Sequence, residues 1–246
     1  MAKRLIDIFL AAFGLIVASP ILLPVMFLVW KQDGYSPFYI APRVARDDKL
    51  FHMVKLRSMI KGADRTGVDS TSTGDNRITG IGHFIRRYKL DELTQLWNVL
   101  IGDMSLVGPR PNVKRETDLY TPIERGLLNA RPGITDFASI VFSDEGEILA
   151  GRPDPDLAYN QLIRPWKSRL GLFYIEHSNV GLDLQLIFLT ALAILSKPRA
   201  LKHVSRLLQN LDAPADLVAV ATRQADLVPT PPPGATGIVM SREATS

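Results

Sequence analysis

The sequence predicts an α+β fold that is mostly α-helical and is attached to a membrane near its N-terminus. A long hydrophobic segment follows the first basic residues, apolar residues recur at helical spacing in several later segments, and residues 36–59 alternate as short strands do. The chain has 246 residues, of which 46% are hydrophobic, which is enough for one medium-sized domain with a buried core.

The composition excludes several kinds of site. The chain has no cysteine, so disulfides, thiolate catalysis and cysteine-ligated zinc are ruled out. Its four histidines lie far apart, without the spacing of metal ligands. The net charge of +4 and the pI of about 9.4 suit an anionic membrane surface or phosphate-bearing ligands, and charge alone does not choose between them.

The hydrophobic segment, residues 8–29, is long enough to cross a membrane but is interrupted at its midpoint. As a helix it would measure about 33 Å, against about 30 Å for the hydrocarbon core. Ser19 and Pro20 lie at its middle, and Pro24 follows one turn later. Each proline lacks an N–H, so the carbonyl groups of Ile16 and Pro20 lose their helical donors. We therefore expect a sharp kink, at which the Ser19 hydroxyl can satisfy a nearby carbonyl.

Basic residues flank this segment on both sides. Lys3 and Arg4 precede it, and seven lysines and arginines against three aspartates follow it within residues 31–61. Positive charge on both sides gives the positive-inside rule no preferred crossing direction. Two arrangements remain open from the residues alone: a helix–break–helix that turns back at Ser19-Pro20 and leaves by the cytoplasmic face, and a kinked single span.

The first elements after this segment can be placed from their residue patterns. Residues 36–59 predict a short strand or two, and the loop at 61–77 is rich in glycine, serine, threonine and aspartate. Apolar residues at helical spacing predict a helix over residues 90–100, which Gly102 ends.

Later elements follow from proline positions and apolar runs. Two prolines fix an extended turn around Arg110. Residues 154–176 predict a helix with a break at Pro165, and the apolar run at 181–195 is too short to span a membrane comfortably. It suits either a buried core helix or an interfacial one.

The predicted organisation has three parts. Residues 1–31 form the membrane helix and residues 32–203 form the domain that carries the chemistry. Residues 204–246 form a disordered C-terminal tail, because its end contains the run "PTPPPGATG".

Two adjacent carboxylates, Asp91 and Glu92, begin the helix predicted over residues 90–100. One explanation is structural, since acidic side chains in a first turn complement its free N–H groups and the helix dipole. The basic surroundings favour another explanation, a site for phosphate. The basic residues nearest in sequence are Arg86, Arg87, Lys89 and Arg110.

Such surroundings keep a carboxylate ionised, as a nucleophile must be. Neighbouring helical residues point about 100° apart, so Asp91 and Glu92 suit separate roles. One can attack while the other holds a hard cation such as Mg²⁺ together with substrate phosphates. The residues thus indicate phosphoryl-type transfer at a membrane surface.

The segment "RRYKLDELTQLWNVLIGDMSLVGPRP" (86–111) closely resembles the bacterial sugar transferases called monotopic phosphoglycosyl transferases. The similarity extends to "KLRSM" (55–59), "DNRITGIGHFIRR" (75–87) and "RPGIT" (131–135), and it covers residues 3 to about 200. The resemblance implies a monotopic protein on the cytoplasmic face of the bacterial inner membrane. It would be anchored by a re-entrant helix and would carry a small cytosolic catalytic domain with interfacial amphipathic helices.

The resemblance also implies an activity and its residues. Such enzymes move a sugar-1-phosphate from a UDP-sugar to polyprenyl (undecaprenyl) phosphate and release UMP. By position, Asp91 would be the nucleophile that forms a covalent phosphosugar intermediate, and Glu92 would bind Mg²⁺. Four basic residues are candidates for phosphate contacts, and a structural salt bridge is an equal alternative for each: Lys55, Arg57, Arg110 and Arg131.

The implied partners are UDP-sugar, polyprenyl phosphate and membrane lipids, with no nucleic acid, and a homo-oligomer is left open. The product would begin an exopolysaccharide, capsule, O-antigen or glycoprotein glycan. Two departures from the family pattern bear on the identity of the sugar more than on the chemistry. "DFASIVFSDEGEIL" from Asp136 replaces the frequent Gly-Trp-Ala-Gln, and Thr94 stands where proline is frequent.

Two other classes of protein compete with this interpretation. A catalytically inactive, membrane-anchored regulator or scaffold of polysaccharide synthesis could keep the same anion site. A single-pass protein with an external domain would lack access to nucleotide sugars. Measuring UMP release from UDP-sugars separates the enzyme from the scaffold.

Overall fold

The computed structural model describes residues 2–66, 70–72 and 74–241, and it confirms the predicted α+β class with mostly helical content. The strands are β1 (Phe38–Val44), β2 (Leu50–Leu56), β3 (Ser105–Val107) and β4 (Gly133–Thr135). The helices of the first half are α1 (Ala2–Asp33), α2 (Gly80–Arg87), α3 (Leu90–Leu93), α4 (Leu96–Ile101) and α5 (Lys114–Thr117). Those of the second half are α6 (Phe137–Val141), α7 (Glu145–Ile148), α8 (Pro155–Ala158), α9 (Arg164–His177), α10 (Val180–Leu195), α11 (Lys197–Asn210) and α12 (Ala215–Thr222).

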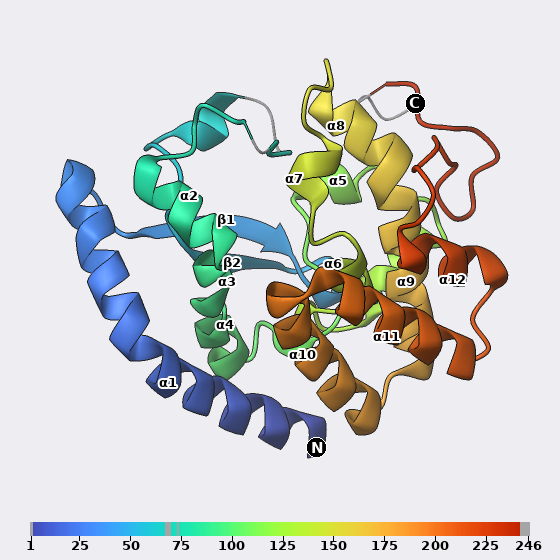
Figure 1. Ribbon diagram of the computed structural model, residues 1–246, viewed down its shortest axis with the longest axis horizontal. Coiled ribbons are helices and arrows are strands. Elements are labelled where there is room, and N and C mark those ends of the chain that lie inside the picture. The colour runs from blue at the N-terminus through green and yellow to red at the C-terminus, as the bar shows by residue number, and fades with distance from the viewer. Residues whose placement is uncertain (1, 67–69, 73, 242–246) are drawn as a thin grey trace.

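The membrane segment is one continuous helix, α1, in which the prolines produce a bend and not a break (Figure 1). The Ser19 hydroxyl donates a hydrogen bond of 2.7 Å to the Ile16 carbonyl. This is the carbonyl that Pro20 leaves without its helical donor, so the helix can continue past the proline. The predicted helix–break–helix is thus corrected to a bent helix. Within the described residues, α1 alone is long and apolar enough to cross a membrane.

The N-terminal end of α1 is attached to the domain by polar contacts. Lys3 forms an ion pair of 2.5 Å with Asp183 on α10, and Arg4 donates to carbonyl groups in the last turn of α4. Asp7 is buried and accepts a hydrogen bond of 2.8 Å from the Ser105 hydroxyl. Basic residues that the sequence offers as a topology signal therefore also anchor the helix to its own domain.

The C-terminal end of α1 is attached as well. Asp33 accepts two hydrogen bonds, of 2.5 and 2.6 Å, from the guanidinium of Arg57 on β2. An apolar cluster lies beside this pair and consists of Leu22, Val25, Val29, Leu56, Ile85 and Leu90. The opposite face of α1 stays exposed and apolar, with Phe9, Phe13, Ile16, Val17, Ile21, Leu23 and Phe27 among its residues. Both ends of the helix thus contact the domain while one face remains free.

The predicted strands at 36–59 are confirmed as an antiparallel hairpin, with Phe38 paired to Leu56 and Val44 paired to Leu50. Beside the hairpin, the buried side chain of Asn98 on α4 contacts β2. Its amide oxygen accepts from the Val54 N–H at 2.9 Å, and its amide nitrogen donates to the His52 carbonyl at 2.8 Å. The side chain therefore satisfies backbone groups of β2 as a neighbouring strand would, and it fixes β2 against α4.

Strands β3 and β4 form a short parallel pair whose ends approach unusually closely. A Cβ atom on Gly133 would lie 2.1 Å from the Gly108 nitrogen, and one on Gly108 would lie 2.4 Å from the Arg131 carbonyl oxygen. Only glycine fits at either position. This approach fixes the start of the Gly-Pro-Arg-Pro turn that carries Arg110.

Two predicted helices differ in detail from the structure. The helix expected over residues 90–100 is divided into α3 and α4, and Gly102, at φ +102°, ends α4 as predicted. The break expected at Pro165 takes the form of a change of helix type, after which Pro165 lies in the first turn of α9. A π-helical turn, Tyr159–Ile163, precedes it and joins α8 to α9.

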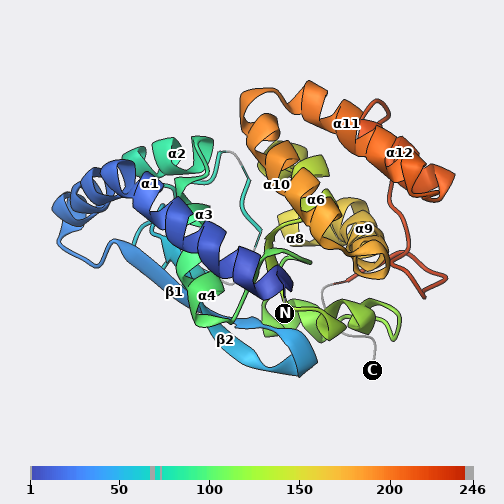
Figure 2. The ribbon, with the colours of Figure 1, turned by 90° about the horizontal axis from the view of Figure 1, so that it is seen from below.

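Helix α10 is a core helix on one face and exposes apolar side chains on the other, so an interfacial position stays a prediction. Leu182, Leu186 and Leu189 are buried in the main core, whereas Phe188 and Leu195 are 67% and 85% exposed. Figure 2 shows α11 and α12 lying outside α10 and α6.

The C-terminal region differs from the predicted disordered tail. The expected boundary at residue 203 falls inside α11, and Val204, Leu208 and Ala221 are fully buried. The proline-rich stretch is held by its carbonyl groups, since Arg169 donates a hydrogen bond of 2.9 Å to the Pro231 oxygen. Composition indicated a tail because prolines have no N–H to donate within helices or sheets, although their carbonyls remain good acceptors.

Replacing Asn98 with alanine should lower the free energy of unfolding by about 1–3 kcal/mol, because it leaves buried backbone groups of β2 without partners. Urea unfolding of detergent-solubilised protein measures the change. The exposed Asn129→Ala variant is the control and should stay within about 0.5 kcal/mol of the parent. Equal stability of the Asn98 variant and the control would show that the side chain does not support β2.

Candidate functional site

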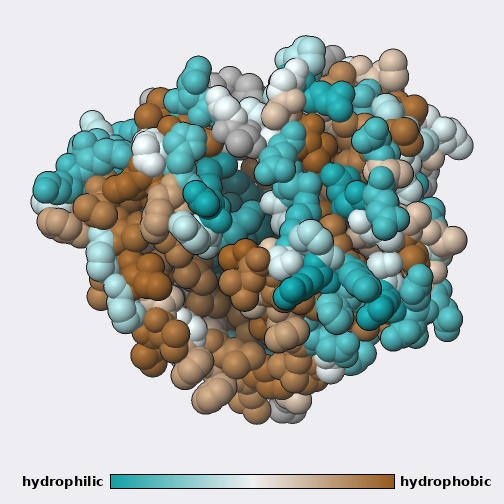
Figure 3. Space-filling model, in the orientation of Figure 1, coloured by the Kyte–Doolittle hydropathy of each residue, from teal (hydrophilic) through white to brown (hydrophobic). Residues whose placement is uncertain are grey.

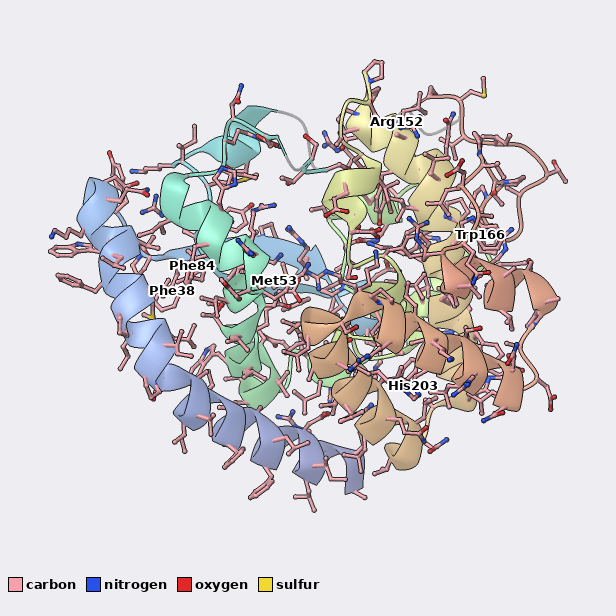
Figure 4. All side chains as sticks on the ribbon, viewed as in Figure 1. Phe38, Met53, Phe84, Arg152, Trp166 and His203 are labelled. Atoms are coloured by element: carbon pink, nitrogen blue, oxygen red, sulfur yellow. The ribbon has the colours of Figure 1, made fainter. Side chains whose placement is uncertain are left out.

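A cavity of about 540 Å³ opens between the β1–β2 hairpin, α2 and α3 on one side and α7 and α9 on the other. Figure 3 shows the hollow near the middle of this face, with hydrophilic residues around it and hydrophobic residues gathered below and to the left. Met53, which lines the cavity, lies near the middle of the molecule between Phe38 and Trp166 (Figure 4).

The cavity has a basic lining. Among the described residues, eight basic and four acidic side chains line it. The basic ones are Arg43, Lys55, Arg57, Lys61, Arg77, Arg86, Arg110 and Lys167, and the acidic ones are Asp64, Asp91, Glu116 and Glu145. Such a surface attracts ligands with several negative charges, phosphates above all.

Asp91 is one of the acidic residues on this mainly basic surface. It is 9% exposed, lines the cavity and belongs to the single turn of α3. Lys89, directly before α3, has a left-handed backbone at φ +55°, which is uncommon for a residue other than glycine. This strained conformation turns the chain from α2 into α3. Because α3 has only four residues, side-chain charges and not a long helix dipole set the electrostatics around Asp91.

Glu92 is paired with Arg110 across the site. The guanidinium donates to the Glu92 carboxylate at 2.7 Å, and both side chains are mostly buried. Burial alone would raise the pKa of Glu92, but the charges of Arg110, Lys89 and Lys55 outweigh it and hold that pKa well below the usual range. The carboxylate therefore stays ionised at neutral pH.

Lys55, on β2, faces the same cavity. Burial, together with the charge of Arg110, lowers the pKa of Lys55 to about 8, against the opposite effect of Asp91 and Glu92. A lysine of this kind is still mostly protonated at neutral pH and can bind phosphate, but it loses its charge in the mildly alkaline range.

The four predicted phosphate-binding residues lie in different surroundings. Lys55, Arg110 and Asp91 line the cavity together, whereas Glu92 is outside its lining and joins the group through its ion pair with Arg110. Arg57 reaches the cavity edge, but its guanidinium is engaged by Asp33 and by the Ser36 carbonyl at 2.9 Å. Arg131 is exposed and does not line the cavity.

Several cavity residues had no role in the sequence interpretation. Arg43 and Lys61 were counted there only as charges that follow the membrane segment. Arg77 belongs to the "DNRITGIGHFIRR" segment, which was a signal for it. Lys167 had no signal, and Glu145 had only its place in the "DFASIVFSDEGEIL" stretch, because the ion pair between them joins two separate helices, α7 and α9.

The donor groups fit a cation that is shared with a ligand better than one held by the protein alone. Within the part of the chain that the structure describes, no group of three His, Cys, Asp or Glu side chains could hold a metal ion. The site instead supplies two adjacent carboxylates, Asp91 and Glu92, beside a basic surface. Mg²⁺ typically takes one or two carboxylates and completes its coordination with water and substrate phosphates.

A comparison with protein families finds a match over most of the chain. Residues 1–197 match the model of the family described as bacterial sugar transferase. This match includes α1, the hairpin, the carboxylate pair and α10, and it ends at the first residue of α11.

Individual relatives agree with this family. The chain is 33% identical over 213 residues to "Undecaprenyl-phosphate galactose phosphotransferase" of Salmonella typhimurium, covering 80% of this chain and 41% of the relative. It is 34% identical over 195 residues to "UDP-glucose:undecaprenyl-phosphate glucose-1-phosphate transferase" of Klebsiella pneumoniae, covering 76% and 39%. It is 31% identical over 209 residues to "Exopolysaccharide production protein ExoY" of Sinorhizobium fredii, covering 79% and 85%. The chain thus spans about two fifths of the first two relatives and most of the third.

Lys55 should make diphosphate binding depend on pH. Because its side chain loses its charge as the pH rises through about 8, the affinity for UDP should fall by roughly tenfold between about pH 7 and pH 9. Isothermal titration calorimetry measures this. The Lys55→Arg variant should keep its affinity across the range, since a guanidinium stays charged. The control variant, Lys114→Arg, changes an exposed lysine, and its affinity for UDP should depend on pH as the parent's does. A Lys55→Arg profile that matches the parent would assign the dependence to another group.

Proposed function

Because the chain belongs to the bacterial sugar transferase family, we propose that it is a phosphoglycosyl transferase. It moves a sugar-1-phosphate from a UDP-sugar to polyprenyl phosphate, with undecaprenyl phosphate as the acceptor, and releases UMP. The relatives' names mention undecaprenyl phosphate and UDP-sugars, which supports these substrates. The exopolysaccharide relative supports a product that begins exopolysaccharide assembly.

One observation carries the proposal: Asp91 lines a cavity with a mainly basic lining, and its neighbour Glu92 is ion-paired with Arg110 of the same lining. Lys55 and Arg110 can neutralise a diphosphate that lies beside Asp91. The ion pair with Glu92 also holds the Arg110 guanidinium in place before any ligand binds. A binding module would not require a nucleophile at this position.

We propose a reaction in two steps. A carboxylate oxygen of Asp91 attacks the phosphorus that bears the sugar, and the bond from that phosphorus to the bridging oxygen breaks. The electron pair of that bond leaves with UMP, and the sugar phosphate remains bound to Asp91. An oxygen of polyprenyl phosphate then attacks the same phosphorus, which releases the Asp91 carboxylate and gives a lipid-linked diphosphate sugar. The basic side chains stabilise the charge that develops on the phosphate oxygens in both steps.

We propose Mg²⁺ as the cofactor, with Glu92 as its protein ligand. When bound, the ion would neutralise phosphate charge and help UMP to depart. Glu92 is already ionised through its neighbours, so no proton has to be displaced when a cation binds. In this role Glu92 would share its two oxygens between the cation and Arg110.

The attachment of α1 supports a monotopic, re-entrant arrangement. Lys3 near one end contacts α10, and Asp33 at the other end contacts β2, so both ends belong on the side where the domain lies. The bend at Ser19-Pro20 and the exposed apolar face between the ends suit a helix that dips into one leaflet. Because UDP-sugars are cytosolic, we propose that the domain lies on the cytoplasmic face of the inner membrane.

Asp91→Asn should abolish turnover, with a loss of about 10³-fold or more, because an amide is not a competent nucleophile. UMP release from UDP-sugars in the presence of Mg²⁺ and undecaprenyl phosphate measures turnover, and intact-protein mass spectrometry detects the sugar-phosphate adduct. Glu92→Gln should raise the Mg²⁺ concentration required by at least about tenfold.

The exposed Asp118→Asn variant is the matched control for these substitutions and should behave as the parent does. Near-normal turnover by Asp91→Asn would reject the nucleophile assignment. A folded parent protein that releases no UMP from any UDP-sugar would instead favour an inactive regulator or scaffold.

The proposed topology can be tested with single cysteines, because the chain contains none. Cysteines at Ala2 and Ser70 should both resist an impermeant maleimide added to intact spheroplasts and should both react once the membrane is opened. Replacing Ser19 and Pro20 with alanine and leucine should favour a straight span and expose position 2 on the outside. If position 2 of the protein with its native Ser19-Pro20 is labelled from the periplasm, α1 spans the membrane.

A further inference from the structure

A pair of oppositely charged side chains forms one wall of the cavity. Glu145, at the start of α7, forms an ion pair with Lys167 on α9, and both side chains are partly buried. The Lys167 ammonium also lies 5.2 Å from the centre of the Tyr159 ring. Tyr159 lines the same cavity from the π-helical turn. The proposed reaction assigns no part to these three side chains.

This wall lies directly beside the proposed reacting centre. A smaller cavity adjoins the large one, and Arg110, Tyr159 and Lys167 line both. Arg110 is also the ion-pair partner of Glu92, so a single side chain, that of Arg110, connects the wall to the carboxylate pair. The opposite charges of Glu145 and Arg110 also affect each other's ionisation, which agrees with this closeness.

We propose that Glu145 and Lys167, together with Tyr159, bind the hydroxyl groups of the donor sugar and thereby select which sugar is transferred; this rests on the proposed function. A carboxylate accepts hydrogen bonds, an ammonium donates them and a phenol does both, which matches a ring that carries several hydroxyl groups. A site built this way discriminates strongly, because an epimer that misplaces one hydroxyl leaves a buried polar group unpaired.

The position of the wall favours the sugar over the nucleoside. The sugar is bonded to the phosphate group that Asp91 attacks, whereas the nucleoside is one phosphate further away. In an in-line displacement the leaving UMP lies opposite the nucleophile. The Glu145 carboxylate also repels phosphates, so the diphosphate belongs at the more basic side of the cavity, near Lys55.

Basic residues at the start of α11 and just after α12 contact Asp144, next to the wall. Asp144, the residue before Glu145, forms an ion pair with Lys197 at the start of α11. The guanidinium of Arg223, just after α12, lies 3.6 Å from the same carboxylate. Glu145 itself lies in the "DFASIVFSDEGEIL" stretch from Asp136, and these ion pairs hold the residue before it next to the wall.

The test compares the parent with Glu145→Gln and Lys167→Gln, with Glu147→Gln as the matched control, since Glu147 is exposed on the same helix and does not line the cavity. For each full-length protein, kcat/KM is measured with UDP-glucose, UDP-galactose and their N-acetylamino counterparts. Inhibition by UMP is measured in parallel, and thermal unfolding shows that each variant is folded.

We expect either cavity variant to change the ratio of kcat/KM between the best donor and its epimer by about tenfold or more. Inhibition by UMP should remain within about twofold of the parent, because UMP lacks the sugar. The Glu147 control should keep the parent's ratio. Should only one cavity variant fold, it serves alone.

Two outcomes would overturn the inference and leave the proposed function intact. One is an equal loss of kcat/KM with every donor, which would mean that the pair acts only through the charge of Arg110. The other is weaker inhibition by UMP with unchanged donor ratios, which would place the nucleoside at this wall. Failure of the parent to use any UDP-sugar would reject the proposed function itself.

Discussion

The ion pair between Glu92 and Arg110 is the interaction on which the arrangement of the site depends. It connects α3 to the turn after β3, and these two segments carry the groups proposed to attack and to stabilise the phosphate. It also balances charge. Many basic side chains around one cavity repel one another, and the lowered pKa of Lys55 is a consequence of burial and of this repulsion. A buried guanidinium without its carboxylate would be costly, by about 3–5 kcal/mol in comparable pairs.

The framework around this pair explains which features could be predicted from the sequence. The strands at 36–59 and the end of α4 at Gly102 follow from local patterns, and the structure has both. The grouping of Asp91 and Glu92 with Arg110 could also be anticipated, because the prolines beside Arg110 restrict its backbone. The fate of Arg57 could not. A basic residue on a strand serves a phosphate or a carboxylate equally well, and only the path of α1 brings Asp33 to it.

Other features depend on contacts between distant parts of the chain, which no local pattern encodes. The two prolines of α1 predict a break when each is judged by its missing N–H, yet a single hydroxyl, that of Ser19, satisfies one free carbonyl and the helix continues. The proline-rich C-terminal stretch has a composition typical of disorder but lies against α9 through its carbonyl groups. Glu145 and Lys167 belong to separate helices and meet in an ion pair, so the sequence singled out the stretch around Glu145 but not its partner.

The contacts that attach α1 to the domain also support the strand that leads to the site. A straight span would carry the N-terminus to the far side of the membrane and would separate Lys3 from Asp183 and Asp7 from Ser105. Asp183 is buried and would lose its cation partner Lys3, whereas Asp7, which moves with α1, would leave the Ser105 hydroxyl and the Leu106 N–H without their acceptor. Asp7 also accepts from the backbone N–H of Leu106 in β3, the strand that leads into the Arg110 turn. The contacts that favour a re-entrant helix therefore also position the strand behind the proposed active site, and a change that straightens α1 should disturb both.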